Sequence, residues 1–258
     1  MKIDKEVKDF LSENKDLINA FDFTTLYELA RKKGYANRIS EMTYVFYHSG
    51  IDPLEYMKSV PDSFAIHLDL PDTVIYIPDQ IKHIYPYAFA DINATKIIAP
   101  ANLKSTPLSK KRLSFENNAA FAHCKDLIEI DFSKCHSYEK IGKGLLEQCP
   151  NLKIIKFPEN LRIIRTGAFA ECKSLTSIDL SKCHKLTDIE YHAFGLCENL
   201  TTIYLPNSIK YIEFAAFDTG KPIIIKFDGT QQEWDEKFGE EIIKGNWNTS
   251  TIDIQYLR

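Results

Sequence analysis

The chain has 258 residues, of which 44% are apolar and 26% are charged. This composition is typical of a folded domain and excludes disordered, collagen-like and coiled-coil chains. Lys and Arg total 32 against 36 Asp and Glu, so the net charge of -4 gives no general attraction for nucleic acid or an anionic membrane. The length fits one large domain or two small ones.

The N-terminus lacks the pattern of a secretory signal, because charged residues interrupt every apolar run in it. Nowhere in the chain do about 18 apolar residues follow one another, so the sequence predicts no transmembrane helix. We therefore expect a cytoplasmic protein whose six cysteines are kept as thiols.

Helical periodicity dominates the first 60 residues. The apolar side chains of the first expected helix share one face, at spacing i, i+3 and i+4: Val7, Phe10 and Leu11. Two more amphipathic stretches end at Gly34 and Gly50, and a short helix is expected from Pro53 to about Ser59. We predict that residues 1–65 form a helical N-terminal cap or, alternatively, an interaction or dimerisation module.

A repeat of about 24 residues follows. Its unit reads L-x-x-I-x-L/F, a turn, and then x-x-I-x-x-x-A-F-x-x-C. The residues at the Phe phase are spaced by 23 or 25 positions after a first interval of 32: Phe89, Phe121, Leu146, Phe169, Phe194 and Phe217. The long first interval indicates an insertion near 101–114. One unit cannot bury its own Leu, Ile and Phe, so copies must stack into a shared core, with strand positions 3 and 5 facing outward.

The cysteines follow the same period. Four of them lie three residues after the Phe phase: Cys124, Cys149, Cys172 and Cys197. Stacked strands lie about 5 Å apart, so we expect a row of buried thiols, in which oxidation of neighbours is geometrically possible. A row is not the tetrahedral arrangement that zinc needs. Two copies of Ser-Lys-Cys-His, at 133–136 and 181–184, are two rungs apart and are explained by duplication, so no metal is predicted.

The repeat resembles the BspA-like class of leucine-rich repeats, best in residues 175–197 and 200–217. The resemblance implies an α/β repeat fold, a short curved leucine-rich-repeat solenoid of about five to six rungs over residues 66–227. Surface members of the class are secreted adhesins. The segment 50–54 resembles the corresponding segment of non-secreted members encoded by bacteria and phages.

The tail at 227–234 resembles the closing motif of the same class. Thr230 and Glu233 have the spacing of a capping box, which predicts a helix start. Residues 228–258 are therefore expected to form a mixed C-terminal cap, with Trp234 and Trp247 over the open end of the solenoid.

No nucleophile elbow, phosphate loop or G-x-G-x-x-G occurs, so we predict neither an enzyme nor a cofactor. The candidate partner-binding residues are those expected at strand positions 3 and 5: Glu129, Ile154, Ser177, Thr202 and Ile224, with Asp131, Lys156, Asp179, Tyr204 and Lys226. A second candidate surface is the basic run Lys110, Lys111 and Arg112. A solvated face without a partner would look similar.

The leading hypothesis is a non-enzymatic protein that binds a partner protein through the solenoid. A phage- or bacterium-encoded factor that captures or inhibits a host or defence protein would fit, in the host cytoplasm if phage-encoded. The alternatives are a component that self-assembles through the N-terminal helices and an adhesin-like protein. No nucleic-acid or membrane partner is expected.

Overall fold

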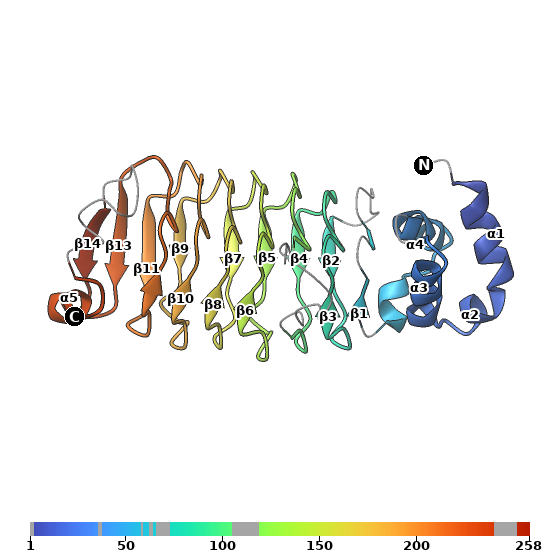
Figure 1. The fold of residues 1–258 in the computed structure, drawn as a ribbon, viewed down its shortest axis with the longest axis horizontal. Helices are drawn as coiled ribbons and strands as arrows, with labels where there is room; N and C mark the ends of the chain where they lie inside the picture. Colours follow the sequence, from blue (N-terminus) through green and yellow to red (C-terminus); the bar gives the residue numbers. More distant parts are fainter. Residues whose placement is uncertain are drawn as a thin grey trace.

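The computed structural model describes residues 3–35, 38–57, 59–61, 64–65, 73–104, 119–239 and 252–258. The molecule is elongated, with a group of helices at one end, a stack of β rungs in the middle and a small cap at the other end (Figure 1). The candidate basic run Lys110, Lys111 and Arg112, and Trp247, lie outside the described residues.

The N-terminal region is helical, as predicted. Its elements are α1 (Lys5–Glu13), α2 (Lys15–Asn19), α3 (Phe23–Lys32), α4 (Ile39–His48) and a short 3-10 helix, η2 (Pro53–Tyr56). The expectation of a helix to about Ser59 was wrong, because the chain leaves η2 for strand β1 (Ser59–Val60), which pairs with β3 (His83–Ile84). Asp4 and Asp22 accept backbone N–H bonds that cap α1 and α3.

The helices and the solenoid share one hydrophobic core. Tyr27 of α3 meets Phe64 edge to face at 5.8 Å between ring centroids, and Phe64 meets Phe89 of the first rungs at 5.8 Å. The Gln80 amide also donates to the carbonyls of Leu54 and Glu55. Because aromatic rings and hydrogen bonds cross this junction, the helices cover the first rung of the stack.

The solenoid consists of short parallel strands on two sides. The first side holds β2 (Val74–Tyr76), β4 (Lys96–Ile98), β5 (Glu129–Asp131) and β7 (Ile154–Lys156), followed by β9 (Ser177–Asp179), β11 (Thr202–Leu205), β13 (Ile223–Phe227) and β14 (Ile252–Tyr256). The second side holds β6 (Lys140–Ile141), β8 (Ile163–Ile164), β10 (Asp188–Ile189) and β12 (Tyr211–Ile212). The predicted repeat solenoid with N-terminal helices is confirmed.

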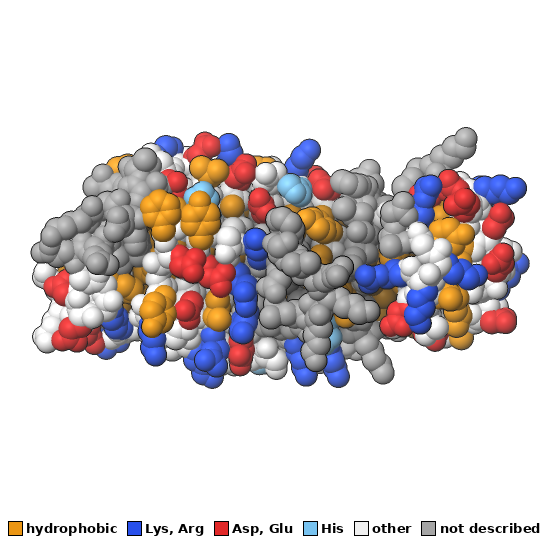
Figure 2. Space-filling view, in the orientation of Figure 1, with side chains coloured by type: hydrophobic (Ala, Val, Ile, Leu, Met, Phe, Trp, Pro, Cys, Tyr) orange, Lys and Arg blue, Asp and Glu red, His pale blue; other side chains and the backbone are white. Residues whose placement is uncertain are grey.

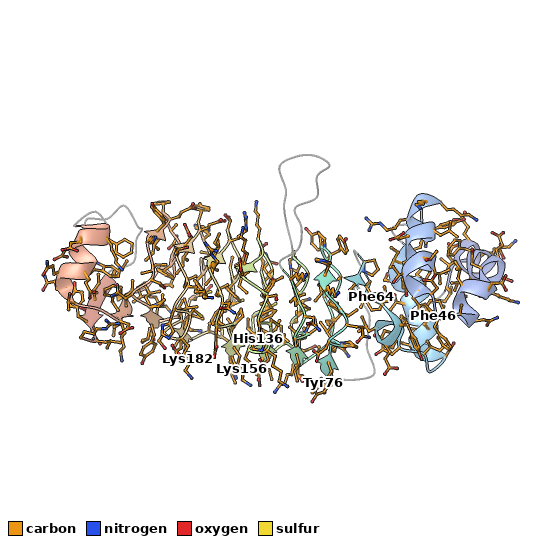
Figure 3. The ribbon with its side chains drawn as sticks, turned by 90° about the horizontal axis from the view of Figure 1, so that it is seen from below. Phe46, Phe64, Tyr76, His136, Lys156 and Lys182 are labelled. Atoms are coloured by element: carbon orange, nitrogen blue, oxygen red, sulfur yellow. The ribbon has the colours of Figure 1, made fainter. Side chains whose placement is uncertain are left out.

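The expected curvature is not seen, since the rungs follow a nearly straight line in two perpendicular views (Figures 1 and 3). A solenoid curves when its two sides have different rung spacings. Here both sides are parallel strands, whose spacing is about 4.8 Å, so neither side is compressed relative to the other. The sequence unit showed one strand clearly and gave no separate signal for the two-residue strands of the second side.

Positions 1, 4 and 6 of the strand unit point into the core, as Leu127, Ile130 and Phe132 show. The rung that contains β7 is an exception, because Ile155 and Phe157 are only partly buried. At this place the first side divides into two four-stranded sheets, and within the described residues no backbone hydrogen bond joins β7 to β9. The second side continues unbroken from β8 to β10.

The cysteine row forms as predicted and consists of buried free thiols. Each thiol of this row donates to a carbonyl of the preceding repeat at 3.2 Å: Cys124 to Phe89, Cys149 to Phe121, Cys172 to Leu146 and Cys197 to Phe169. Burial raises the pKa of Cys197 to about 12. These thiols therefore act as hydrogen-bond donors between rungs, and oxidation of neighbours would remove those bonds.

The C-terminal cap begins with α5 (Gln231–Phe238). Thr230 and Glu233 form the predicted capping box. Trp234 is fully buried and packs edge to face on Phe227, at 5.1 Å between ring centroids. Within the described part of the chain, no helix is long and apolar enough to cross a membrane.

Candidate protein-binding faces

The ten candidate residues lie in two rows along the first side of the solenoid. The register pairs Glu129 with Ile154 and Asp131 with Lys156. Beyond the break, it aligns Ser177, Thr202 and Ile224 in one row, and Asp179, Tyr204 and Lys226 in the other. Figure 3 shows Tyr76 and Lys156 along one long side of the solenoid. We call this surface the strand face.

The charges of the strand face are paired in its N-terminal half. Lys156 Nζ lies 2.8 Å from Glu129 Oε1 and 3.1 Å from Asp131 Oδ2, and Lys96 Nζ lies 3.1 Å from Glu129 Oε1. The hydrogen bond to Lys156 lowers the pKa of Glu129, and burial opposes this effect only in part. A partner that docks here would have to compete with this network.

The two aspartates of the strand face also hold turns. Asp131 accepts hydrogen bonds from the backbone N–H and hydroxyl of Ser133, and Asp179 does the same with Ser181. The serines belong to the two Ser-Lys-Cys-His copies, whose cysteines are buried and donate to Pro100 and Pro158. The copies thus serve a structural turn. No group of three metal-ligating side chains occurs among the residues described.

The C-terminal half of the strand face has a different character. Lys226 lies over the ring of Tyr204, 5.0 Å from its centroid, and donates to its hydroxyl at 3.3 Å. Around this pair lie the small hydroxyl side chains of Ser177 and Thr202 and the half-buried Ile224. The carboxylate–lysine network of the N-terminal half is not repeated in the described strands here.

A second exposed surface was missed by the sequence reasoning. Tyr191, Tyr211 and Phe214, on and after β10 and β12, are 43%, 66% and 54% exposed. Their signal in the sequence is their place in the unit, because Tyr191 and Phe214 both stand two residues after the buried Ile of the second strand. Only the last two repeats have an aromatic residue at that position, and the repeat unit L-x-x-I-x-L/F marks outward positions for the first strand alone.

A shallow hollow of about 560 Å³ lies where the first strands begin, between Thr73 and Lys153. The residues that line it are polar except for Ile128, and they include Asn93, Asp126 and Asn151. Asn151 is occupied in joining rungs, because its amide donates to the Lys125 carbonyl at 2.7 Å. Among the described residues that line it, Asp126 and Lys153 are the titratable ones, and they do not form a convergent set of the kind that catalysis uses.

The architecture defines a class, the leucine-rich-repeat solenoids. Six copies of the BspA type leucine rich repeat region match residues 71–110 and 109–224, so the chain belongs to this family. Leucine-rich-repeat proteins generally mediate protein–protein interaction or adhesion and are typically not enzymes.

Solved structures of bacterial leucine-rich-repeat proteins are similar to this chain. The T. pallidum leucine rich repeat protein TpLRR is 26% identical over 62% of this chain and 66% of its own, with a TM-score of 0.44. A leucine rich cell surface protein of Faecalibacterium prausnitzii A2-165 is 22% identical over 72% of this chain and 61% of its own, with a TM-score of 0.42. This chain therefore spans about two thirds or less of their lengths. No curated protein matches the chain.

Proposed function

We propose that this chain is a protein-interaction module that binds a partner protein on the strand face. One observation carries the proposal: within each half of the first side, paired parallel strands hold side chains outward in register. Rows of this kind hold contact residues at fixed spacing, so binding a partner does not require the entropic cost of ordering a loop. The mixture of charged, aromatic and aliphatic groups is typical of protein-binding surfaces.

The C-terminal half of the strand face is the better docking region. A partner that contacts Ser177, Thr202 or Ile224 displaces water only, whereas contact with Glu129 or Lys156 disturbs existing ion pairs. Tyr204 supplies a rigid aromatic contact, and Lys226 holds it from one side. Aromatic residues of this kind carry much of the binding energy at protein interfaces.

The test is a cross-linking capture from cells, with the wild-type chain and two matched variants as baits. The test variant is Ser177→Lys with Thr202→Arg, and the control is Ser12→Lys with Thr25→Arg at exposed helix positions. We expect a partner that the wild type and the control retain and that the test variant loses by at least about tenfold. Equal retention by all three proteins would show that the strand face is not the docking surface.

Self-association through the N-terminal helices is a second candidate function, favoured by one exposed aromatic pair. Phe21 and Tyr56 stack at 4.5 Å and are 41% and 46% exposed. Light scattering of the full chain and of Phe21→Ser with Tyr56→Ser tests this candidate. A dimer that dissociates in the variant supports it, and a monomeric wild type refutes it.

A further inference from the structure

The second side of the solenoid carries an exposed surface near its C-terminal end that combines aromatic and acidic side chains. Strands β10 and β12, with the residue or two that follow each, present three carboxylates and three aromatic rings and no lysine or arginine: Asp188, Glu190, Tyr191, Tyr211, Glu213 and Phe214. We call these six residues the acidic aromatic patch. Over the C-terminal half of the solenoid, Figure 2 shows acidic side chains lying between hydrophobic ones.

The backbone fixes the relative positions of these groups. The register sets Asp188 of β10 opposite Tyr211 of β12. Glu213 Oε2 accepts the backbone N–H of Tyr191 at 2.8 Å, which holds this carboxylate beside the turn that carries Tyr191. The rings of Tyr191 and Phe214 are nearly parallel, with centroids 6.2 Å apart. Strand pairing, one hydrogen bond and one ring contact therefore hold parts of the patch in place.

Not all the ring faces are equally open. The imidazole of His192 stacks on Tyr191 at 4.2 Å, which supports that ring from one side. Tyr211 and Phe214 are more than half exposed and stand on either side of Glu213 in the sequence. The end of β12 therefore carries two exposed rings and one carboxylate within four residues, and this is the place where we look for a ligand.

The negative charge of the patch is only partly neutralised within the described residues. Arg165 lies 3.8 Å from Glu190, but no ion pair is formed there by Glu213 or Asp188. One carboxylate oxygen of Glu213 accepts the Tyr191 N–H, and the other can accept a hydrogen bond from a ligand. Lys210 flanks the patch at the start of β12 without pairing with it. The contrast with the strand face is clear, since Lys96 and Lys156 neutralise Glu129 there.

We propose that the acidic aromatic patch binds an arginine side chain of an extended segment in a partner protein. A guanidinium group can lie flat on the Tyr211 or Phe214 ring while its N–H groups bond the Glu213 carboxylate. Arginine fits better than lysine, because only its planar group can stack and bond at the same time. This proposal goes beyond strand-face binding, since it concerns the other side of the solenoid and states the chemistry of the partner.

The experiment is a titration of the full chain with three acetylated, amidated peptides that differ in one residue type. Each has two test residues separated by one glycine, and these are arginine, lysine or the neutral isostere citrulline. Binding is followed by two-dimensional NMR at physiological ionic strength and pH 8. We expect saturable binding of the arginine peptide, weaker binding of the lysine peptide, and a loss of at least about tenfold with citrulline.

Two variants and one control locate the site. Glu213→Gln keeps an oxygen that accepts the Tyr191 N–H but removes the charge, and Tyr211→Ala removes an exposed ring. Each is expected to weaken arginine-peptide binding about threefold to fivefold. The control is Tyr76→Ala in β2, because Tyr76 is 68% exposed and lies on the strand face. It should leave binding unchanged.

Several results would overturn the proposal. The first is that no peptide shows saturable binding up to about 10 mM. The second is that the citrulline peptide binds as tightly as the arginine peptide, and the third is that both test variants bind the arginine peptide as tightly as the wild-type chain does. Equal capture of the partner by the wild type, the strand-face variant and the control, with the peptide titration as expected, would reject the proposed function and leave this inference standing. Capture that is lost in the strand-face variant, together with a failed peptide titration, would reject only the inference.

Discussion

The two halves of the first side differ although their repeats share one pattern. In the N-terminal half, from β2 to β7, the outward charges are paired and the last rung is loosely filled, with Ile155 and Phe157 only partly buried. In the C-terminal half, from β9 to β14, the equivalent Ile178 and Leu180 are buried, and β13 and β14 reach five residues each. Repeat spacing therefore fixes where a strand lies, while side-chain packing determines how long and how well paired it becomes.

The break between the halves affects one side of the molecule. On the second side, Ile164 of β8 still pairs with Ile189 of β10. The thiol of Cys172 also reaches back to Leu146 across the same boundary. The two halves are therefore joined along one side and through the core, and parted along the other.

The largest effect is expected when two phenylalanines that flank Phe169, Phe194 and Phe157, are each replaced and the two losses of stability are compared. Phe194 is fully buried and stacks on Phe169 at 5.1 Å, whereas Phe157 is half-buried and meets the same ring at 5.8 Å. We expect Phe194→Ala to lower the free energy of unfolding by about 3–5 kcal/mol, and Phe157→Ala by less than half of that. Chemical denaturation of both variants measures the difference. Equal losses would show that the β7 rung is as tightly packed as its neighbours.

Removal of single thiols tests whether the break is confined to one side. Cys149 and Cys172 are both buried and donate to a preceding carbonyl at the same distance, 3.2 Å. Cys149→Ala and Cys172→Ala should each cost about 1–3 kcal/mol, because each leaves a buried carbonyl without a donor. The two losses should agree. A markedly smaller loss for Cys172→Ala would mean that the break extends through the core.

Alkaline pH gives a further measure of thiol burial. The pKa of Cys197 is raised to about 12 by burial, so the unfolded chain releases this proton before the folded chain does. The pKa of this thiol in the unfolded chain is near 8.5, and below that pH its full contribution to the free energy of unfolding is present. The contribution is lost as the pH rises from there toward 12, the pKa in the folded chain. We expect a slope of up to about 1.4 kcal/mol per pH unit from this thiol, and Cys197→Ala should reduce the slope measured by denaturation between these limits.

The sequence predicted the features that depend on spacing alone. Period, phase and residue type were enough for the buried row from Cys124 to Cys197, the capping box at Thr230 and the outward rows. The break at β7 could not be predicted, because Leu152, Ile155 and Phe157 match the unit as well as Leu175, Ile178 and Leu180 do. The acidic aromatic patch was missed because two-residue strands have too short a pattern to recognise.

The two aspartate turns allow a matched test of the ion network. Asp131 and Asp179 make the same pair of bonds to serine, at 2.9 and 2.6 Å, but Asp131 also pairs with Lys156. We expect Asp179→Ala to cost about 1 kcal/mol and Asp131→Ala slightly more. The excess should disappear when both aspartate variants are compared in a Lys156→Ala background, which denaturation curves of the double variants would measure. An excess that persists would have a source other than Lys156.

The smallest effect concerns Glu129. The hydrogen bond to Lys156 lowers its pKa, so its stabilisation is present above the ordinary carboxyl pKa and is lost as pH falls through the lowered value. Glu129→Gln should therefore lower the free energy of unfolding by about 1 kcal/mol or less at neutral pH. In strong acid it should have no effect, because the protonated Glu129 is then as uncharged as the glutamine that replaces it. Glu198→Gln in the C-terminal half is the control, since Glu198 and Lys173 are about half exposed and their pair should contribute nothing measurable. If the two variants behaved alike at neutral pH, the paired charges would not distinguish the N-terminal half, and packing at β7 would be the whole difference between the halves.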